Sequence, residues 1–165
     1  MNTKPVSNTA KPGLLSVDEA LAQLLAGATP VRDVEQLPTL QASGRVLAED
    51  QRSVMNVPPM DNSAMDGYAV RCVDVAPGRP IEVSQRIPAG QVGTALIPGS
   101  VARIFTGAPV PAGADAVLMQ EEGTVLPDGR VQFARVPVAG QWIRSAGEDI
   151  QQGAVVLRSG ERIGP

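Results

Sequence analysis

Histidine is absent from this 165-residue sequence, and cysteine occurs only once, at Cys72. The lack of histidine excludes Ser–His–Asp and Cys–His catalytic arrangements and almost all catalytic zinc sites. A single cysteine excludes an intrachain disulfide and a cysteine-rich metal site. Any chemistry that the chain performs therefore depends on carboxylates, hydroxyls, arginine, backbone amides or a bound metal.

Aromatic residues and excess positive charge are also scarce. Aromatics make up 2% of the sequence, and the net charge is −3. Nucleic-acid surfaces usually combine positive charge with aromatic rings on which bases stack. No apolar run reaches 18 residues, and the N-terminus lacks the apolar segment of a signal peptide. We therefore expect no nucleic-acid or membrane partner and a cytoplasmic location.

The 17 glycines and 15 prolines predict many turns and few helices. Residues 1–13 are polar and contain two prolines, which favours a disordered tail. One helix is predicted within residues 14–27, because Ser16 and Glu19 have the spacing of a capping box. Gly27 is predicted to be the residue just after the helix, in the left-handed conformation that commonly ends helices. An apolar stripe recurs at helical spacing: Val17, Leu21, Leu24 and Leu25.

Beyond Pro30 the sequence favours β-structure, because short runs rich in valine and isoleucine alternate with glycine and proline turns. Asp128-Gly129 predicts a hairpin with a two-residue turn between residues 124–126 and 130–133. The spacing indicates a small antiparallel sandwich or barrel. The expected strands are residues 68–71, 81–87, 101–105, 116–121, 130–135, 142–144 and 154–157.

The first unusual loop covers residues 58–68, PPMDNSAMDGY. It is not an EF-hand loop, because the ligand positions and the glycine are misplaced. An aspartic-protease site is excluded as well, since no second matching loop exists. Two interpretations remain open: a turn that only starts a strand, or a rigid acidic loop that holds Asp66 as a metal ligand or base.

The second loop, TGAPVPAGAD over residues 106–115, follows an expected strand. Small residues and proline would make it stiff, so its amides could approach a ligand closely. It lacks the Gly-Lys-Ser/Thr ending of a P-loop. It could be a plain connection, or it could present Thr106 and the Gly107 amide to a ligand.

The third loop is Gly-Glu-Asp-Ile over residues 147–150, shortly after Arg144. Mg²⁺ often binds through one or two carboxylates together with substrate phosphates, so Glu148 and Asp149 are candidates. A solvated acidic pair is the alternative. Three stiff polar loops at strand ends of one small β domain are together more suggestive of function than each alone.

At these loops the sequence resembles the molybdopterin molybdenumtransferase family, which includes MoeA and the E domain of gephyrin. The motifs are PPMDNSAMDGYAVR, RIFTGAPVPAGADAV followed by MQE, and IRSAGEDI followed by GAVV. The segment GRVLAED over residues 44–50 also matches the opening of the family. The resemblance covers residues 14–165.

The resemblance implies the last step of molybdenum cofactor biosynthesis. Family members insert molybdate into adenylylated molybdopterin and release AMP in a Mg²⁺-dependent reaction. They are homodimers of elongated four-domain subunits that work beside other proteins of cofactor biosynthesis. The active cleft lies between a small β domain of one subunit and a pterin-binding α/β domain of the other.

The resemblance also assigns roles to residues. Asp66, Thr106 and Asp149 match positions whose side chains matter for activity, and Asp66 and Asp149 are the expected Mg²⁺ ligands. Five further residues are expected to orient these side chains or to meet phosphate and molybdate: Asn62, Ser63, Gly107, Arg144 and Glu148. The absence of histidine fits this chemistry of carboxylates, hydroxyls and Mg²⁺.

The expected organisation follows from the same resemblance. Residues 53–149 form the small β domain, inserted in an elongated dimerisation arm made of residues 28–52 and 150–165. The family's α/β domain would begin near Pro165, so the chain matches an N-terminal portion that supplies half of the active cleft and is inactive alone. The alternative is a non-catalytic β module for interaction or dimerisation.

Overall fold

The computed structural model of the protein describes residues 13 and 15–164. The predicted disordered tail, apart from Gly13, lies outside these residues. The chain divides into two compact units between Ala42 and Ser43. Among the described residues, no helix is both long and apolar enough to cross a membrane.

The first unit contains helix α1, Val17–Gly27, and the predicted capping box is confirmed. The Ser16 hydroxyl accepts from the Glu19 amide at 3.2 Å, and the Glu19 carboxylate accepts from the Ser16 amide at 2.8 Å. The predicted role of Gly27 is wrong, because it is the last helical residue and Ala28 continues in an extended conformation. No residue of α1 is buried within the chain, so its apolar stripe is exposed. A single 3₁₀ turn, η1 (Thr39–Gln41), follows in this unit.

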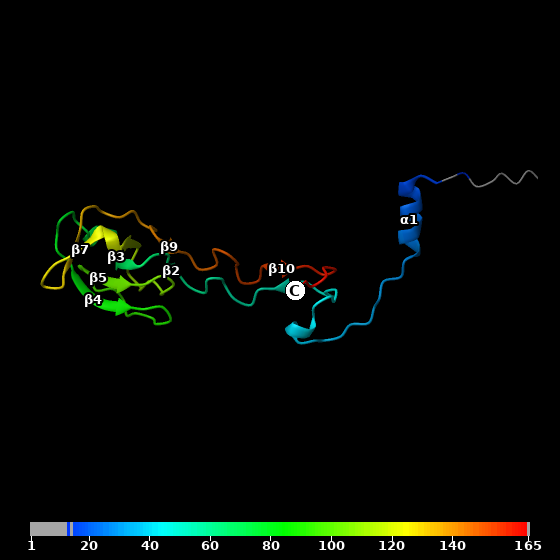
Figure 1. The fold of residues 1–165 in the computed structure, drawn as a ribbon, viewed down its shortest axis with the longest axis horizontal. Coiled ribbons are helices and arrows are strands. Elements are labelled where there is room, and N and C mark those ends of the chain that lie inside the picture. The colour runs from blue at the N-terminus through cyan, green and yellow to red at the C-terminus, as the bar shows by residue number, and fades with distance from the viewer. Residues whose placement is uncertain (1–12, 14, 165) are drawn as a thin grey trace, which may run out of the picture. The chain divides into compact units, whose positions relative to one another are not determined.

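The second unit is built on a four-stranded sheet in the order β4-β5-β3-β6. Figure 1 shows β3, β4 and β5 side by side in this unit. Their bounds are β3 Gly67–Val70, β4 Glu82–Ile87, β5 Ser100–Ile104 and β6 Ala116–Met119. β3 is antiparallel to both of its neighbours, whereas β4 and β5 run parallel.

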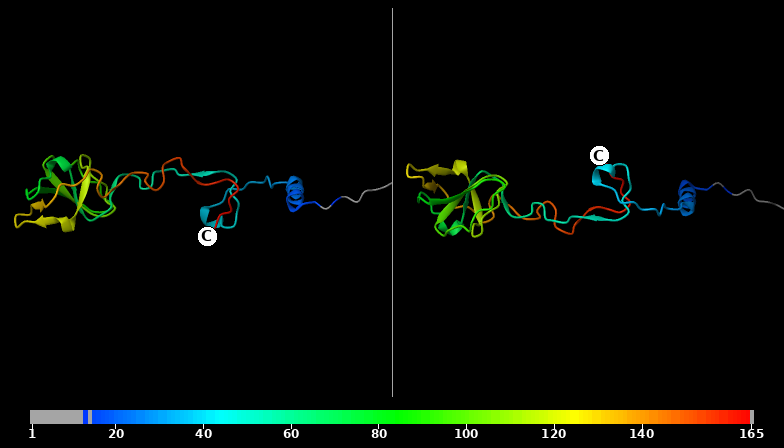
Figure 2. Two further views of the ribbon diagram at one scale, coloured as in Figure 1. Left: turned by 90° about the horizontal axis from the view of Figure 1, so that it is seen from above. Right: turned by 90° about the horizontal axis from the view of Figure 1, so that it is seen from below.

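Three small two-stranded pairings complete the unit. Their strands are β1 Gln51–Arg52 with β10 Val155–Leu157, β2 Asn62–Ser63 with β9 Ile143–Arg144, and β7 Gly123–Val125 with β8 Val131–Phe133. Two 3₁₀ turns also occur, η2 (Cys72–Asp74) and η3 (Gln120–Glu122). The segment before β2 and the segment after β9 run side by side in every view (Figures 1 and 2).

The core lies on the two faces of the four-stranded sheet, because successive residues of β3 point to opposite sides. Tyr68 and Val70 pack in one cluster with Leu118 and Phe133. The rings of Tyr68 and Phe133 meet edge to face with centroids 5.5 Å apart. Ala69 belongs to the other cluster, on the opposite face. The sheet is therefore buried on both faces at the strands that carry the loops of interest.

The predicted mainly β fold with one helix is confirmed, with corrections in detail. The sheets are small and, within residues 43–164, do not close into a barrel. The sheet is not wholly antiparallel, because a 12-residue connection, residues 88–99, lets β4 and β5 pair in parallel. The strand expected over residues 116–121 ends at Met119, where η3 turns the chain.

The hairpin at Asp128-Gly129 is present, but its loop has three residues instead of two. The Leu126 amide donates to the Arg130 carbonyl, and the Gly129 amide donates to the Leu126 carbonyl. Within the loop of residues 127–129, Gly129 alone has a positive φ, at 84°. This is a turn followed by one left-handed residue, so the predicted two-residue turn is wrong.

Candidate functional site

Asp66 and Thr106 meet at one end of the four-stranded sheet. Gly67 of β3 pairs with Ile104 of β5 in antiparallel register. Because of this register, the residue that precedes β3 lies next to the residues that follow β5. The Asp66 Oδ1 atom accepts hydrogen bonds from both the amide and the hydroxyl of Thr106, each at 2.8 Å.

These contacts lower the pKa of the Asp66 carboxyl below its ordinary value of 3.8. The Thr106 amide is the largest cause, followed by the Thr106 hydroxyl, and the positive charge of Arg103 adds to them. Hydrogen bonds to a carboxylate favour its ionised form. Asp66 is therefore a fixed anion at neutral pH whose Oδ2 atom makes no hydrogen bond to any described residue.

Arg103 is a functional candidate that the sequence reasoning missed. Its guanidinium donates to the carbonyls of Gly67 and Ile104, both at 2.8 Å, and to the side-chain oxygen of Gln120. The Gln120 amide in turn donates to the Asp66 carbonyl at 3.0 Å. Arg103 thus ties together the strand ends that carry Asp66 and Thr106. The sequence did contain a signal for this role, since Arg103 interrupts the apolar run of residues 101–105. A charge in such a strand needs polar partners nearby.

Ser63 and Gly107 join the first loop to the second. The Ser63 amide donates to the Ala108 carbonyl at 2.9 Å, and the Gly107 amide donates to the Ser63 carbonyl at 2.8 Å. The Ser63 hydroxyl is buried and donates to the Met65 carbonyl at 2.6 Å. These contacts suit an orienting role and not direct contact with an oxyanion, because the hydroxyl of Ser63 and the amide of Gly107 are already used.

Arg144 binds the acidic pair of the third loop. One terminal nitrogen of Arg144 lies 2.7 and 2.8 Å from the two carboxylate oxygens of Asp149, and Nε lies 3.7 Å from Glu148. The pairing raises the already high pKa of Arg144, chiefly through Asp149. Glu148 and Asp149 also line an open hollow of about 560 Å³, whose other wall includes Val155.

The structure brings all three loops together through backbone pairing. Asn62 in the first loop pairs with Arg144 and forms a bridge to Pro109 of the second loop. The Asp61 carboxylate accepts from the Ala146 amide at 2.8 Å, which ties the first loop to the third. Sequence reasoning missed this use of Asp61. The Asn62 side chain itself makes no hydrogen bond to the residues described here.

The two expected Mg²⁺ ligands differ in how well they suit a metal. Over residues 13 and 15–164, no group of three or more potential ligand side chains is gathered. Asp66 retains an oxygen without a hydrogen bond, which fits an ion held by one carboxylate together with waters and substrate oxygens. Asp149 does not fit while both of its oxygens contact Arg144. This disposition favours Asp66 as the ligand on this chain.

Comparison with known proteins places this β-rich unit and its three loops in a family. The family described as "MoeA N-terminal region (domain I and II)" matches residues 15–165. The chain therefore belongs to the MoeA N-terminal region family.

Curated relatives and solved structures agree with this membership. A molybdopterin molybdenumtransferase of Haemophilus influenzae is 40% identical over 153 residues, which are 92% of this chain and 38% of that protein. Molybdopterin molybdenumtransferase 2 of Mycobacterium tuberculosis is 36% identical, covering 88% of this chain and 36% of that one. The crystal structure of a molybdopterin biosynthesis MoeA protein from Pyrococcus horikoshii aligns with a TM-score of 0.79 at 37% identity, over 89% of this chain and 40% of that chain. The chain thus spans about two fifths of the length of these relatives.

Proposed function

We propose that this chain supplies the small β domain half of the active cleft of a molybdopterin molybdenumtransferase. The reaction is the insertion of molybdate into adenylylated molybdopterin with release of AMP. The observation that carries the proposal is the Asp66–Thr106 contact, set among three converging loops in a chain whose named relatives are molybdopterin molybdenumtransferases. We place the reaction in the cytoplasm, in a homodimer.

The residues of this chain would act by positioning charge. Asp66 is held by Thr106, so its carboxylate keeps one orientation and stays ionised. A carboxylate cannot bind molybdate or a phosphate directly, since all are anions. Asp66 is the residue on this chain that would hold Mg²⁺, and the chemistry that this ion would supply is neutralisation of negative charge on the phosphate oxygens.

The third loop would serve the polar side of the cleft. Arg144 is half-exposed, and its guanidinium holds Asp149 and Glu148. A guanidinium pairs well with phosphate or molybdate oxygens, so an incoming anion could compete with Asp149 for Arg144. Once Arg144 binds the anion, the Asp149 carboxylate would be released and could act as the expected Mg²⁺ ligand. Its present contacts with Arg144 are therefore compatible with that role.

A chimeric enzyme tests the proposal directly. Residues 15–165 would replace the matching region of the Haemophilus influenzae relative, to which they are 40% identical. We expect the chimera to insert molybdate and release AMP from adenylylated molybdopterin when Mg²⁺ is supplied. The 165-residue chain alone should show no turnover, because half of the cleft lies outside it. A folded chimera without activity would contradict the proposal and favour the non-catalytic interaction module.

A further inference from the structure

Two arginines lie side by side on neighbouring strands of the main sheet. Arg86 of β4 is the register partner of Arg103 of β5. Their guanidinium carbons lie 4.5 and 4.4 Å from the centroid of the same ring, that of Phe105. Like charges directly opposite one another destabilise a sheet. Stacking on the Phe105 ring and the negative charge of Asp66, which acts on Arg103, offset part of this repulsion, and an anion bound beside both guanidinium groups would offset more of it.

No carboxylate among the described residues pairs directly with either guanidinium. Arg86 makes no hydrogen bond or ion pair with the residues that the structure describes. Arg103 donates only to neutral oxygens, those of two carbonyls and one amide. Among the carboxylates near the β7–β8 hairpin, Glu122 pairs with Arg135 and Asp128 pairs with Arg130. Glu121 accepts a hydrogen bond from the Gln120 side chain and forms no ion pair with the described residues.

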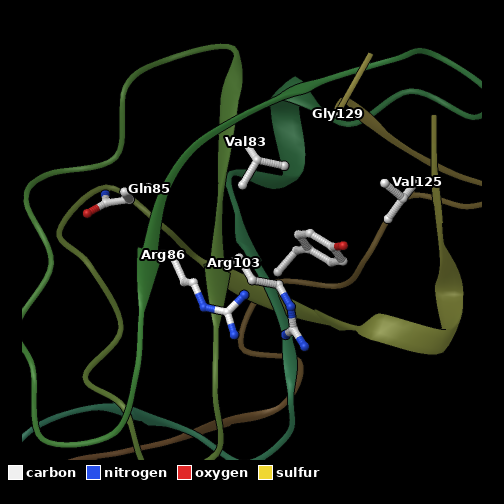
Figure 3. A pocket seen from close by; sticks show the side chains of 7 residues that line it. Val83, Gln85, Arg86, Arg103, Val125 and Gly129 are labelled. Atoms are coloured by element: carbon white, nitrogen blue, oxygen red, sulfur yellow. The ribbon is translucent and has the colours of Figure 1, made fainter. Parts of the chain in front are cut away.

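The arginine pair lines an open hollow of about 460 Å³. We call it the arginine hollow; its walls include Tyr68, Val83, Arg86, Arg103, Val125 and Gly129. Figure 3 shows the two arginine side chains reaching from adjacent strands in the same direction, with Val83 and Val125 at the apolar side. Tyr68 completes the row, because it is the register partner of Arg103 on β3 and its ring lies 5.4 Å from that guanidinium. The hollow thus combines two positive charges with an apolar wall and contains no acidic lining residue.

The two arginines also retain N–H donors that are available to a bound anion. A guanidinium carries five N–H groups, and Arg103 uses three of them for the contacts above. Arg86 uses none within the described residues. Two adjacent guanidinium groups suit the two negative charges and several oxygens of a phosphate better than the single charge of a carboxylate.

We propose that the arginine hollow binds a small organic monophosphate. The phosphate lies between Arg86 and Arg103, and the carbon body packs against Val83, Val125 and Tyr68. This site does not rest on the proposed transferase activity, since its test measures binding to the chain itself. It adjoins the candidate active site, because Arg103 also holds the strand ends that carry Asp66 and Thr106.

Nuclear magnetic resonance titrations at low salt test the site with three probes: phenyl phosphate, inorganic phosphate and phenol. We expect phenyl phosphate to shift the amide resonances of Tyr68, Val83 and Arg103 saturably. Inorganic phosphate should bind there more weakly, since it lacks the apolar body, and phenol should not bind because it lacks the charge. Salt should weaken the binding by screening.

Substitutions at Arg86 give the decisive comparison. Arg86→Ala should weaken phenyl phosphate binding roughly tenfold, the size of one lost charge-assisted hydrogen bond. Arg86→Lys keeps the charge and should lose less. The control is Arg158→Ala, which removes the same charge from an exposed arginine after β10. The proposal is overturned if no probe binds saturably, if the shifts map elsewhere, or if Arg86→Ala and Arg158→Ala have the same effect.

Discussion

Asp66 and Thr106 are joined by two hydrogen bonds of 2.8 Å, both received by the same carboxylate oxygen of Asp66. The two residues are 40 positions apart in the sequence. The antiparallel register of β3 and β5 brings them together, and Arg103 fixes the strand ends beside them. This arrangement leaves the second oxygen of Asp66 available and keeps the carboxylate ionised.

Removal of the Thr106 hydroxyl should raise the pKa of Asp66 only part of the way to 3.8. The Thr106 amide is the larger cause of the lowered pKa, and Thr106→Ala keeps it. Thr106→Ser keeps both donors and should leave the pKa near that of the parent chain. A carboxyl-carbon nuclear magnetic resonance titration measures this. Asp128, whose pKa is lowered by Arg130, serves as an internal control and should not change.

The same contact predicts the sign of one pH effect on stability. Because the pKa of Asp66 is lowered in the folded chain, its contribution to stability is complete above 3.8 and is lost as the pH falls through the lower folded value. Thr106→Ala should shrink this contribution. Urea unfolding of both chains between neutral pH and pH 3 measures it. A difference between the chains that grows as the pH falls would contradict the assignment.

Asp61→Ala should loosen the link between the first and third loops. The Ala146 amide loses its acceptor at 2.8 Å, so its hydrogen exchange should accelerate by roughly tenfold. Asp61→Asn retains a side-chain oxygen and should protect the amide partly. The Gly147 amide, which donates to the Pro58 carbonyl, is the reference within the same loop. Equal exchange at Ala146 in all three chains would show that the contact is not formed in solution.

Gly67→Ala should destabilise the sheet beside the candidate site. A Cβ atom at this position would lie 1.9 Å from the Leu118 carbonyl oxygen, which belongs to the backbone of β6 and cannot move aside cheaply. The expected loss in free energy of unfolding is about 1–3 kcal/mol, as for other overpacked sites. Gly164→Ala is the control, because nothing lies within 4 Å of its added Cβ atom. The free energies of unfolding are measured by urea denaturation. Equal losses for Gly67→Ala and Gly164→Ala would contradict the close packing of Gly67 against β6.

The sequence predicted the strands and the main candidates better than the connections between them. Short, mostly apolar runs marked β3, β5 and β6, since burial on both faces of the sheet demands such residues. Asp66 and Thr106 were found because they stand at strand ends in motifs with no evident structural need. The grouping of all three motifs on one small unit also followed from their order.

The remaining details depend on long-range register, which a local pattern does not encode. β2 and β9 have only two residues each, so they carry no periodicity, yet their pairing helps to join the first loop to the third. The parallel pairing of β4 with β5 likewise depends on the path of residues 88–99. Arg103 stands out in the sequence as a charge in an apolar run, but its partners could not be predicted, because two are backbone carbonyls and the third is the side chain of Gln120 on another strand end.

Cys72 should react slowly with alkylating reagents while the chain is folded. Burial is the main cause that raises the pKa of its thiol to about 11, and the carboxylate of Asp115 adds to it. At pH 8 almost no thiolate is present, whereas an unfolded cysteine has a pKa near 8.5. Asp115→Asn should speed iodoacetamide labelling, but less than unfolding in urea does. Labelling of the folded chain as fast as that of the unfolded chain would exclude the raised pKa.

The most direct test of the account is the molybdate insertion rate of the chimeric enzyme with Asp66→Asn. The proposed role predicts a loss of about 10²-fold or more, because an amide cannot supply the charge that the reaction needs. Asp128→Asn is the matched control, since it removes an exposed carboxylate that is also paired but lies in the β7–β8 hairpin. It should leave the rate unchanged. Equal rates for the Asp66→Asn, Asp128→Asn and unsubstituted chimeras would contradict the central claim that Asp66 serves the reaction.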